Sequence, residues 1–172
     1  MARATATATT EKLYPTRNDL RESTRTQVAA LLNRRLADAI DLQGQSKQAH
    51  WNVKGPNFIA LHELFDKVYE AMEEYVDLIA ERIVQLGGIA EGTTRVVAER
   101  SELDEYPLAM ASGAEHVKVL STALAAFGSR MRFAINESDE LEDAATADIC
   151  TEIARGIDKW LWFIEAHVQG RA

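Results

Sequence analysis

Apolar residues recur every three or four positions along most of this chain, which is the spacing of one face of an α-helix. The first stripe begins at Asp19, which resembles a capping box with Glu22, and ends at Gly55-Pro56. The second begins at Asn57, a residue suited to cap a helix, and stops at Gly87-Gly88. We predict two long helices, whose inward positions are Val28, Leu31, Leu32, Leu36, Ala39, Ile40, Phe58, Leu61, Phe65, Val68, Met72, Tyr75, Ile79 and Ile83.

The second half of the chain has the same periodicity after an irregular stretch. Residues 89–112 contain Gly92 and Pro107 with a short helical pattern near Val96, which is typical of a crossover. Two more helices follow, separated by the acidic turn NESDELED at 136–143. Their inward positions are Val117, Leu120, Leu124, Phe127, Met131, Ile135, Ile149, Ile153, Ile157, Trp160, Leu161, Ile164 and Val168. The pattern predicts an all-α fold: a ferritin-like four-helix bundle with a long crossover, containing a short helix, between its second and third helices.

Composition bounds the domain organisation and the partners. The chain has 172 residues, 47% of them apolar, which suits one domain at 18–172 preceded by a mobile tail at 1–17. The net charge of −8 argues against coating nucleic acid or an anionic membrane by charge alone. The single cysteine excludes an internal disulfide, and the N-terminus lacks the apolar segment of a signal peptide. We therefore expect a cytoplasmic protein without a membrane span.

Two histidines flank the Gly55-Pro56 turn. His50 lies about six positions before it and His62 about six after, so their imidazoles are expected to approach across the hairpin. Asp66 follows His62 by one helical turn on the same face. A His-His-carboxylate set suits iron, zinc and manganese, and three ligands are enough to hold a metal. These three residues are therefore candidate metal ligands.

A second carboxylate pair, Asp77 and Glu81, shares this helix face. Relative to His62, Asp66, Asp77 and Glu81 lie at about 40°, 60° and 100° around the axis. Asp77 is nevertheless about 22 Å from His62 along the axis, too far for one ion to be bound by both. If two chains pack these helices antiparallel about a two-fold axis, His62 and Asp66 of one meet Asp77 and Glu81 of the other. The alternative is a solvated acidic face with ordinary histidines at helix ends, which spacing alone favours.

The motifs KQAHWNVKGPNFIALHELFD, AERIVQLGG, EGTT, YPL, TADI and DKWLWFIEAHV resemble the Dps family of miniferritins, the DNA-protection-during-starvation proteins. The resemblance extends over about residues 20–169. It implies a dodecameric shell that oxidises Fe(II) with hydrogen peroxide and stores ferric mineral. It also implies ferroxidase centres made by His50, His62 and Asp66 of one subunit with Asp77 and Glu81 of its two-fold mate, with zinc or manganese as substitute metals. No histidine here follows a Glu by three residues, which argues against a di-iron centre inside one bundle.

Three further features take a role from the resemblance. Trp51 matches a tryptophan beside the centre and could donate an electron, although packing at the subunit interface explains it equally well. Asp143 and Asp148 are candidates for the acidic pore through which iron enters, while acids that stabilise a helix start are the alternative. His116 and His167 are expected to be packing or surface residues.

DNA binding stays open at this stage. Family members that bind DNA commonly use a lysine-rich terminal tail, whereas the first twenty residues here hold only Arg3, Lys12 and Arg17 against Glu11 and Asp19. Such tails predict a modest, salt-sensitive attraction. The competing function is a nucleoid-binding structural protein in which DNA compaction dominates and the metal site is secondary.

Overall fold

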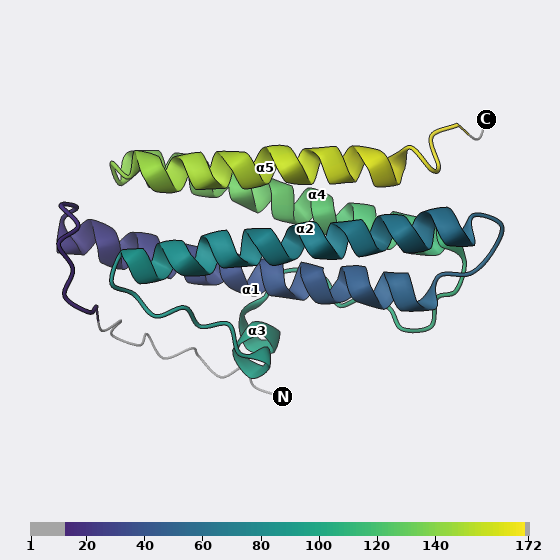
Figure 1. Ribbon diagram of the computed structural model, residues 1–172, viewed down its shortest axis with the longest axis horizontal. Coiled ribbons are helices and arrows are strands. Elements are labelled where there is room, and N and C mark those ends of the chain that lie inside the picture. Colours follow the sequence, from purple (N-terminus) through teal and green to yellow (C-terminus); the bar gives the residue numbers. More distant parts are fainter. Residues whose placement is uncertain (1–12, 171–172) are drawn as a thin grey trace.

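Four long helices and one short helix make up the described part of the chain. The structure is a computed structural model that describes residues 13–170. The elements are α1 (Glu22–Asn52), α2 (Phe58–Gln85), α3 (Thr94–Arg100), α4 (Gly113–Glu140) and α5 (Ala144–Glu165). The four long helices lie side by side, and α3 sits outside them in the crossover between α2 and α4 (Figure 1). The all-α, ferritin-like arrangement with its short crossover helix is therefore confirmed.

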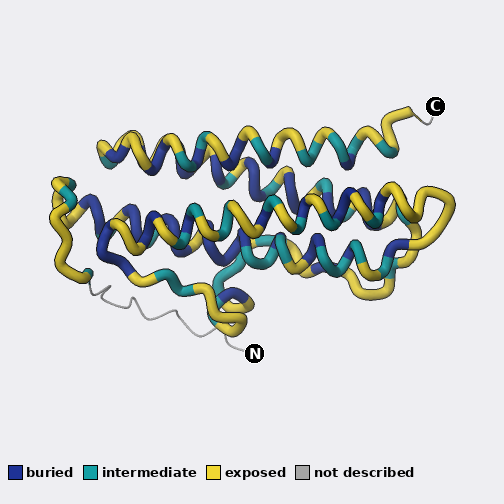
Figure 2. The backbone as a smooth tube through the Cα atoms, viewed as in Figure 1, coloured by how far each residue is buried: buried dark blue, intermediate teal, exposed yellow. Residues whose placement is uncertain are grey.

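The core lies where the apolar stripes of the four long helices meet. Each helix alternates buried and exposed positions, with the buried side turned toward its neighbours (Figure 2). Phe65 and Phe127 are among the largest fully buried side chains, and Cys150 is also fully buried. Two predicted core positions are wrong: Phe58 and Val168 are each 40% exposed. Phe58 is the first residue of α2, and Val168 lies beyond the end of α5, so neither has a neighbouring helix on every side.

The predicted caps of the first two helices do not form. α1 begins at Glu22, later than expected, and its N-cap residue Arg21 makes no side-chain cap. The side chain of Asn18 instead accepts a hydrogen bond from the Leu20 amide at 3.0 Å, which turns the chain before the helix. Asn57 does stand at the N-cap position of α2, but its side chain makes no capping hydrogen bond.

The connection between α4 and α5 is shorter than the acidic sequence suggests. α4 continues through Glu140, so only residues 141–143 form the turn, with Glu142 at a φ of 62°. The acidic residues Glu137, Asp139 and Glu140 belong to the last turns of α4. Ser112 and Glu115 form a full capping box at the start of α4.

The segment before α1 is tied to the end of α2. The Tyr14 amide donates a hydrogen bond to the Gly87 carbonyl at 2.7 Å. Gly87 has a φ of +87°, and a Cβ there would lie 2.5 Å from the Tyr14 carbonyl oxygen, so both conformation and space require glycine. Of the proposed tail at 1–17, residues 1–12 lie outside the described residues. Within the described range, no helix is long and apolar enough to span a bilayer.

Candidate metal centre

His50 and His62 come together across the α1–α2 hairpin. Their ring centroids are 3.7 Å apart and the ring planes differ by 23°, so the imidazoles are stacked. His50 lies near the end of α1 and His62 near the start of α2, at equal distances from the Gly55-Pro56 turn. The prediction that the two rings approach each other is confirmed. Phe58, at the start of α2, packs on His62 with a centroid distance of 5.1 Å.

Each histidine is oriented by the backbone of the other. His50 Nδ1 lies 2.8 Å from the His62 carbonyl oxygen, and His62 Nδ1 lies 2.9 Å from the His50 carbonyl oxygen. A carbonyl can only accept, so both Nδ1 atoms must carry the proton. In a neutral ring this leaves the lone pair on Nε2, the tautomer in which histidine binds a metal while its other nitrogen is held by the backbone. The hairpin therefore presents two stacked imidazoles with Nε2 free for coordination.

Asp66 lies beside this pair and is held by a cation from α1. Its carboxylate is 3.8 Å from His50 Nδ1 and accepts a short hydrogen bond from the Lys47 ammonium group. That hydrogen bond, helped by the charges around it, lowers the pKa of Asp66, so the carboxylate is ionised at neutral pH. In the single chain Asp66 is therefore paired with Lys47. Among residues 13–170 no group of three or more His, Cys, Asp or Glu side chains is arranged to hold a metal.

The prediction that His50, His62 and Asp66 are one half of a site shared with a second subunit stays a prediction, because the structure describes a single chain. Asp77 and Glu81, the other predicted ligands, are exposed on α2 farther along the helix. The structure therefore brings together His50, His62 and Asp66 but not the second carboxylate pair. Lys47 was missed by the sequence reasoning, although its position three residues before His50 places it on the same helix face.

The remaining predicted site residues are divided between the surface and the interior. Trp51 is 65% exposed at the end of α1. Asp148 is exposed on α5, whereas Asp143 is only 2% exposed and caps that helix. Both oxygens of Asp143 accept hydrogen bonds from Arg82, at 2.8 and 3.0 Å. In the single chain Asp143 thus caps α5 and pairs with Arg82, and the assignment of Asp143 and Asp148 to an iron-entry pore stays a prediction.

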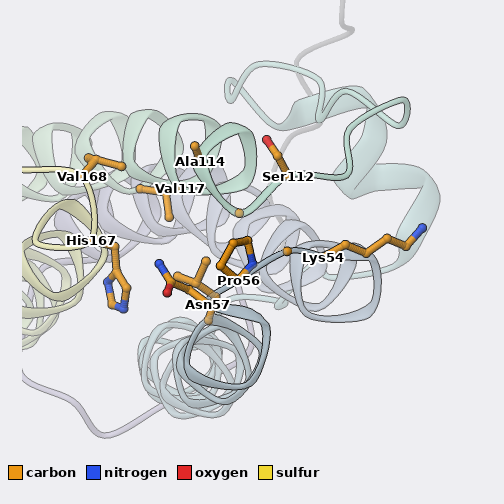
Figure 3. Close-up of a pocket in the computed structure, with 11 residues that line it drawn as sticks. Lys54, Pro56, Asn57, Ser112, Ala114, Val117, His167 and Val168 are labelled. Atoms are coloured by element: carbon orange, nitrogen blue, oxygen red, sulfur yellow. The ribbon is translucent and has the colours of Figure 1, made fainter. Parts of the chain in front are cut away.

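A small cavity opens at the hairpin end of the bundle but is separate from the histidine pair. It has a volume of about 210 Å³ and lies between the α1–α2 turn, the start of α4 and the residues after α5 (Figure 3). Pro56 and Asn57 face it from the turn, while Lys54 extends away (Figure 3). None of His50, His62 and Asp66 lines it. The candidate half-site formed by His50, His62 and Asp66 is therefore separate from this cavity.

Comparison with known proteins defines the class. Residues 29–171 match the ferritin-like domain family. The chain is 44% identical over 161 residues to a DNA protection during starvation protein of Agrobacterium fabrum, covering 94% of this chain and 99% of the relative. A protein of the same name from Brevibacillus brevis is 34% identical, covering 83% of this chain and 95% of the relative.

Solved structures give the same assignment. Dps from Mycobacterium smegmatis superposes with a TM-score of 0.87 at 30% identity, covering 91% of this chain and 96% of that one. DpsA14 from Streptomyces coelicolor superposes with a TM-score of 0.86 at 32% identity, covering 93% and 97%. The fold and the matched domain make this a ferritin-like protein. Within that class the chain belongs to the Dps family, whose membership implies iron storage and DNA protection.

Proposed function

We propose that this protein oxidises Fe(II) with hydrogen peroxide at centres shared by two subunits and stores the ferric product inside a dodecameric shell. His50, His62 and Asp66 of one subunit and Asp77 and Glu81 of its two-fold mate are the proposed iron ligands. The observation that carries the proposal is the reciprocal Nδ1–carbonyl bonding of the two histidines, which leaves both Nε2 atoms free. We place the protein in the cytoplasm, where Fe(II) and peroxide are its substrates.

The ligand types account for the reaction. Imidazole nitrogens bind Fe(II), and carboxylate oxygens stabilise Fe(III) still more, which favours transfer of electrons to peroxide. Two Fe(II) ions supply the two electrons that convert one hydrogen peroxide into two hydroxide ions, so no hydroxyl radical is released. Zinc or manganese would fit the same mixed nitrogen and oxygen ligands. Lys47 has to give up Asp66, or share it, when a cation binds.

The division of ligands between two subunits rests on helix geometry. Asp66, Asp77 and Glu81 share one side of α2, but Asp77 is about 22 Å from His62 along the axis. Only a second copy can bring the two halves together, and an isologous interface does so twice. Trp51 is exposed beside His50 and belongs to the same proposed interface, as a packing residue or an electron donor.

Fe(II) and peroxide added to the assembled protein test the activity through the rise in ferric absorbance. We expect fast oxidation in the wild type and loss of at least about 100-fold of the rate in the His50→Ala/His62→Ala double variant, because ligand loss removes the centre. His167→Ala is the matched control, since His167 bonds only its own helix through Nδ1 to Phe163 at 2.9 Å. Equal rates in the wild type and the double variant would remove the ferroxidase assignment.

Co-expression of two inactive variants tests the sharing. One carries His50→Ala/His62→Ala and the other Asp77→Asn/Glu81→Gln. In a mixed two-fold pair, one site loses all four groups while the other keeps them all. Random mixing in equal amounts makes about half of the pairs mixed, so about a quarter of the sites are intact and about a quarter of the rate returns. A centre within one subunit predicts no recovery, and a native mass far below twelve subunits would contradict the shell.

The competing function, DNA compaction with a secondary metal site, is less well supported. The net charge is −8, and nothing in the described residues offers a motif for base recognition.

A further inference from the structure

Tyr106 and His116 form a buried polar pair that the proposed iron ligands do not use. Tyr106 is in the crossover before α4 and is 7% exposed, while His116 is in the first turns of α4 and is 1% exposed. The phenol oxygen lies 2.6 Å from His116 Nδ1, a short distance for a hydrogen bond between neutral groups. The other nitrogen, Nε2, is enclosed and makes no well-aligned hydrogen bond within the described chain. The two side chains are therefore buried together and hydrogen-bonded to each other.

Burial determines which atom holds the proton. It raises the pKa of the Tyr106 phenol well above its usual value and lowers the pKa of the His116 imidazole. The backbone of Asn52 and the charge of Glu115 act the other way on His116 but more weakly. At neutral pH the phenol is therefore protonated and the imidazole is an uncharged base, so the O–H donates to Nδ1. A proton acceptor is already in place for any event that makes the phenol acidic.

His116 packs against the α1–α2 hairpin, which carries the proposed iron ligands His50, His62 and Asp66. The His116 ring contacts Phe65, with centroids 6.4 Å apart, and Phe65 immediately precedes Asp66. The backbone of Asn52, two residues after His50, also interacts with the imidazole. The crossover is fixed to the turn here, because the Lys54 amide donates to the Ala111 carbonyl at 2.8 Å and the Gly113 amide to the Lys54 carbonyl at 3.1 Å. His116 therefore contacts residues next to His50 on α1 and next to Asp66 on α2.

We propose that Tyr106 and His116 form a redox pair that donates one electron to hydroxyl radical, or an equivalent one-electron oxidant, produced when peroxide meets a single Fe(II) at the neighbouring centre. This role rests on the proposed iron oxidation. Peroxide needs two electrons, and one Fe(II) supplies only one, which leaves a hydroxide ion and a hydroxyl radical.

The step is balanced in electrons and protons. The Tyr106 O–H bond breaks, its electron reduces the hydroxyl radical to hydroxide, and its proton moves to His116 Nδ1. The products are a neutral tyrosyl radical and a histidinium ion. A later Fe(II) returns the electron and becomes Fe(III), while the proton returns from Nδ1 to the phenol oxygen. The buried base makes the transfer local, since a phenol without an acceptor would have to form a charged radical in an apolar site.

Rapid-freeze electron paramagnetic resonance is the direct test. Assembled protein receives about one Fe(II) per centre and then excess peroxide, a condition that creates the odd electron deficit. We expect a tyrosyl radical in the wild type, identified by loss of line width on deuteration of the tyrosine rings, and its disappearance in Tyr106→Phe. In D₂O the radical should lose the coupling to one exchangeable proton, the proton held by His116, which a purely structural hydrogen bond would not produce.

The chain provides its own controls. It contains four tyrosines, and Tyr75→Phe is the matched variant, because Tyr75 is also partly buried with a raised phenol pKa but pairs with Trp160 instead. That variant should keep the signal. A second protein in which Tyr14, Tyr69 and Tyr75 are all phenylalanine retains Tyr106 alone and should also keep it. This second protein decides the question if Tyr106→Phe does not assemble.

A second arm separates this pair from the iron chemistry. Iron-free protein is oxidised by a photogenerated ruthenium(III) tris-bipyridine complex, and the same variants are compared. A Tyr106 radical in this arm, together with no radical from iron and peroxide, would support the redox activity of the pair and contradict the proposed iron reaction. A radical that persists in assembled Tyr106→Phe in both arms, or none in the protein that retains only Tyr106, overturns the proposal.

Discussion

Lys47 alters the chemistry expected of the half-site at the level of single residues. Its ammonium group pairs with Asp66, which lies 3.8 Å from His50 Nδ1. The side chains are 27% and 36% exposed, so water screens the interaction and the pair contributes little to stability. Its effect on the proposed function is larger, because a divalent cation bound at the proposed centre would compete with this ammonium group for the Asp66 carboxylate oxygen.

Replacing Lys47 by methionine should tighten cation binding. An exposed ion pair of this type is worth about 0.2–1 kcal/mol, which corresponds to a gain in affinity of roughly 1.5- to 5-fold. Isothermal calorimetry with zinc, a redox-inert probe, measures it on the assembled protein. Lys67→Met is the control. Lys67 is exposed and follows Asp66 in the sequence, and within residues 13–170 it forms no ion pair. Weaker zinc binding in Lys47→Met would mean that Lys47 supports the bound state.

The histidines were predictable because a helical hairpin has simple geometry. Equal distance from Gly55-Pro56 was enough to place His50 opposite His62. The Asp66–Lys47 contact was not predicted, because a flexible four-carbon side chain reaches many carboxylates and only the three-dimensional packing selects one. The pairing of Asp143 with Arg82 was not predicted either. Arg82 lies sixty-one residues away in the sequence, and the helical periodicity does not show that the two side chains meet.

At the scale of elements, a buried carboxylate holds the turn between α4 and α5 in place. Asp143 accepts the Thr146 amide at 3.1 Å as the cap of α5, and it also binds Arg82 from α2. Arg82 in turn donates to the Thr146 hydroxyl at 2.9 Å. One buried carboxylate in the α4–α5 turn therefore joins the start of α5 to α2.

Removing that carboxylate alone should be costly. Asp143→Ala leaves the Arg82 guanidinium buried without its partner, which costs about 3–5 kcal/mol and corresponds to a fall of about 6–20 °C in the thermal midpoint. The Arg82→Met/Asp143→Ser variant removes the buried charge and keeps a capping hydroxyl, so it should recover at least about 1 kcal/mol of that loss. Midpoints are compared at one protein concentration. A double variant as unstable as Asp143→Ala would show that the charges themselves are essential.

The same corner predicts a response to acid. Burial raises the pKa of Asp143, but hydrogen bonds from Thr146 and Arg82 outweigh it and hold the pKa below the usual range. A depressed native pKa stabilises the fold above the unfolded value of about 3.9, and this stabilisation is lost as pH falls through the native value. Between pH 5 and pH 3, which lie about one unit either side of the unfolded pKa, the thermal midpoint of the wild type should therefore fall by more than that of Arg82→Met/Asp143→Ser. Parallel falls would contradict the assignment.

Helix existence could be predicted more reliably than helix ends, and the reason is physical. The apolar stripes reflect burial in the bundle, which is why residues such as Phe65 and Met131 lie in the core as expected. Ends depend on a few local hydrogen bonds. Asp19 and Glu22 matched the capping pattern, but the chain before α1 is held by Tyr14 and Asn18 instead, so the helix starts later.

At the scale of the whole molecule, the exposed apolar side chains bear on the proposed assembly. Several large apolar side chains are well exposed on different elements, among them Trp51 at 65%, Ile59 at 61%, Phe133 at 66% and Trp162 at 62%. Side chains of this kind would be covered in the proposed shell, where subunits pack against one another. A native mass about twelve times the 19.1 kDa chain is what the proposed shell requires.

Charge then limits what such a shell can do with DNA. Each chain contributes −8, and the tail offers Arg3, Lys12 and Arg17 against Glu11 and Asp19, about one net positive charge. We expect a gel shift with linear duplex DNA at low salt that disappears near 0.15 M, about physiological ionic strength, because few phosphates are neutralised per tail. Deleting residues 1–12 should abolish even the low-salt shift.

The converse variant makes the DNA prediction two-sided. Glu11→Lys/Asp19→Lys raises the tail from about +1 to about +5 without altering a residue of the core, since Asp19 is exposed before α1 and Glu11 lies in the tail. Many such tails on one shell act together, so their phosphate contacts multiply and the shift should survive physiological salt. Tight binding by the wild type at that salt would mean that a surface outside the tail holds the DNA. No gain in the variant would contradict the role given to the charge of the tail.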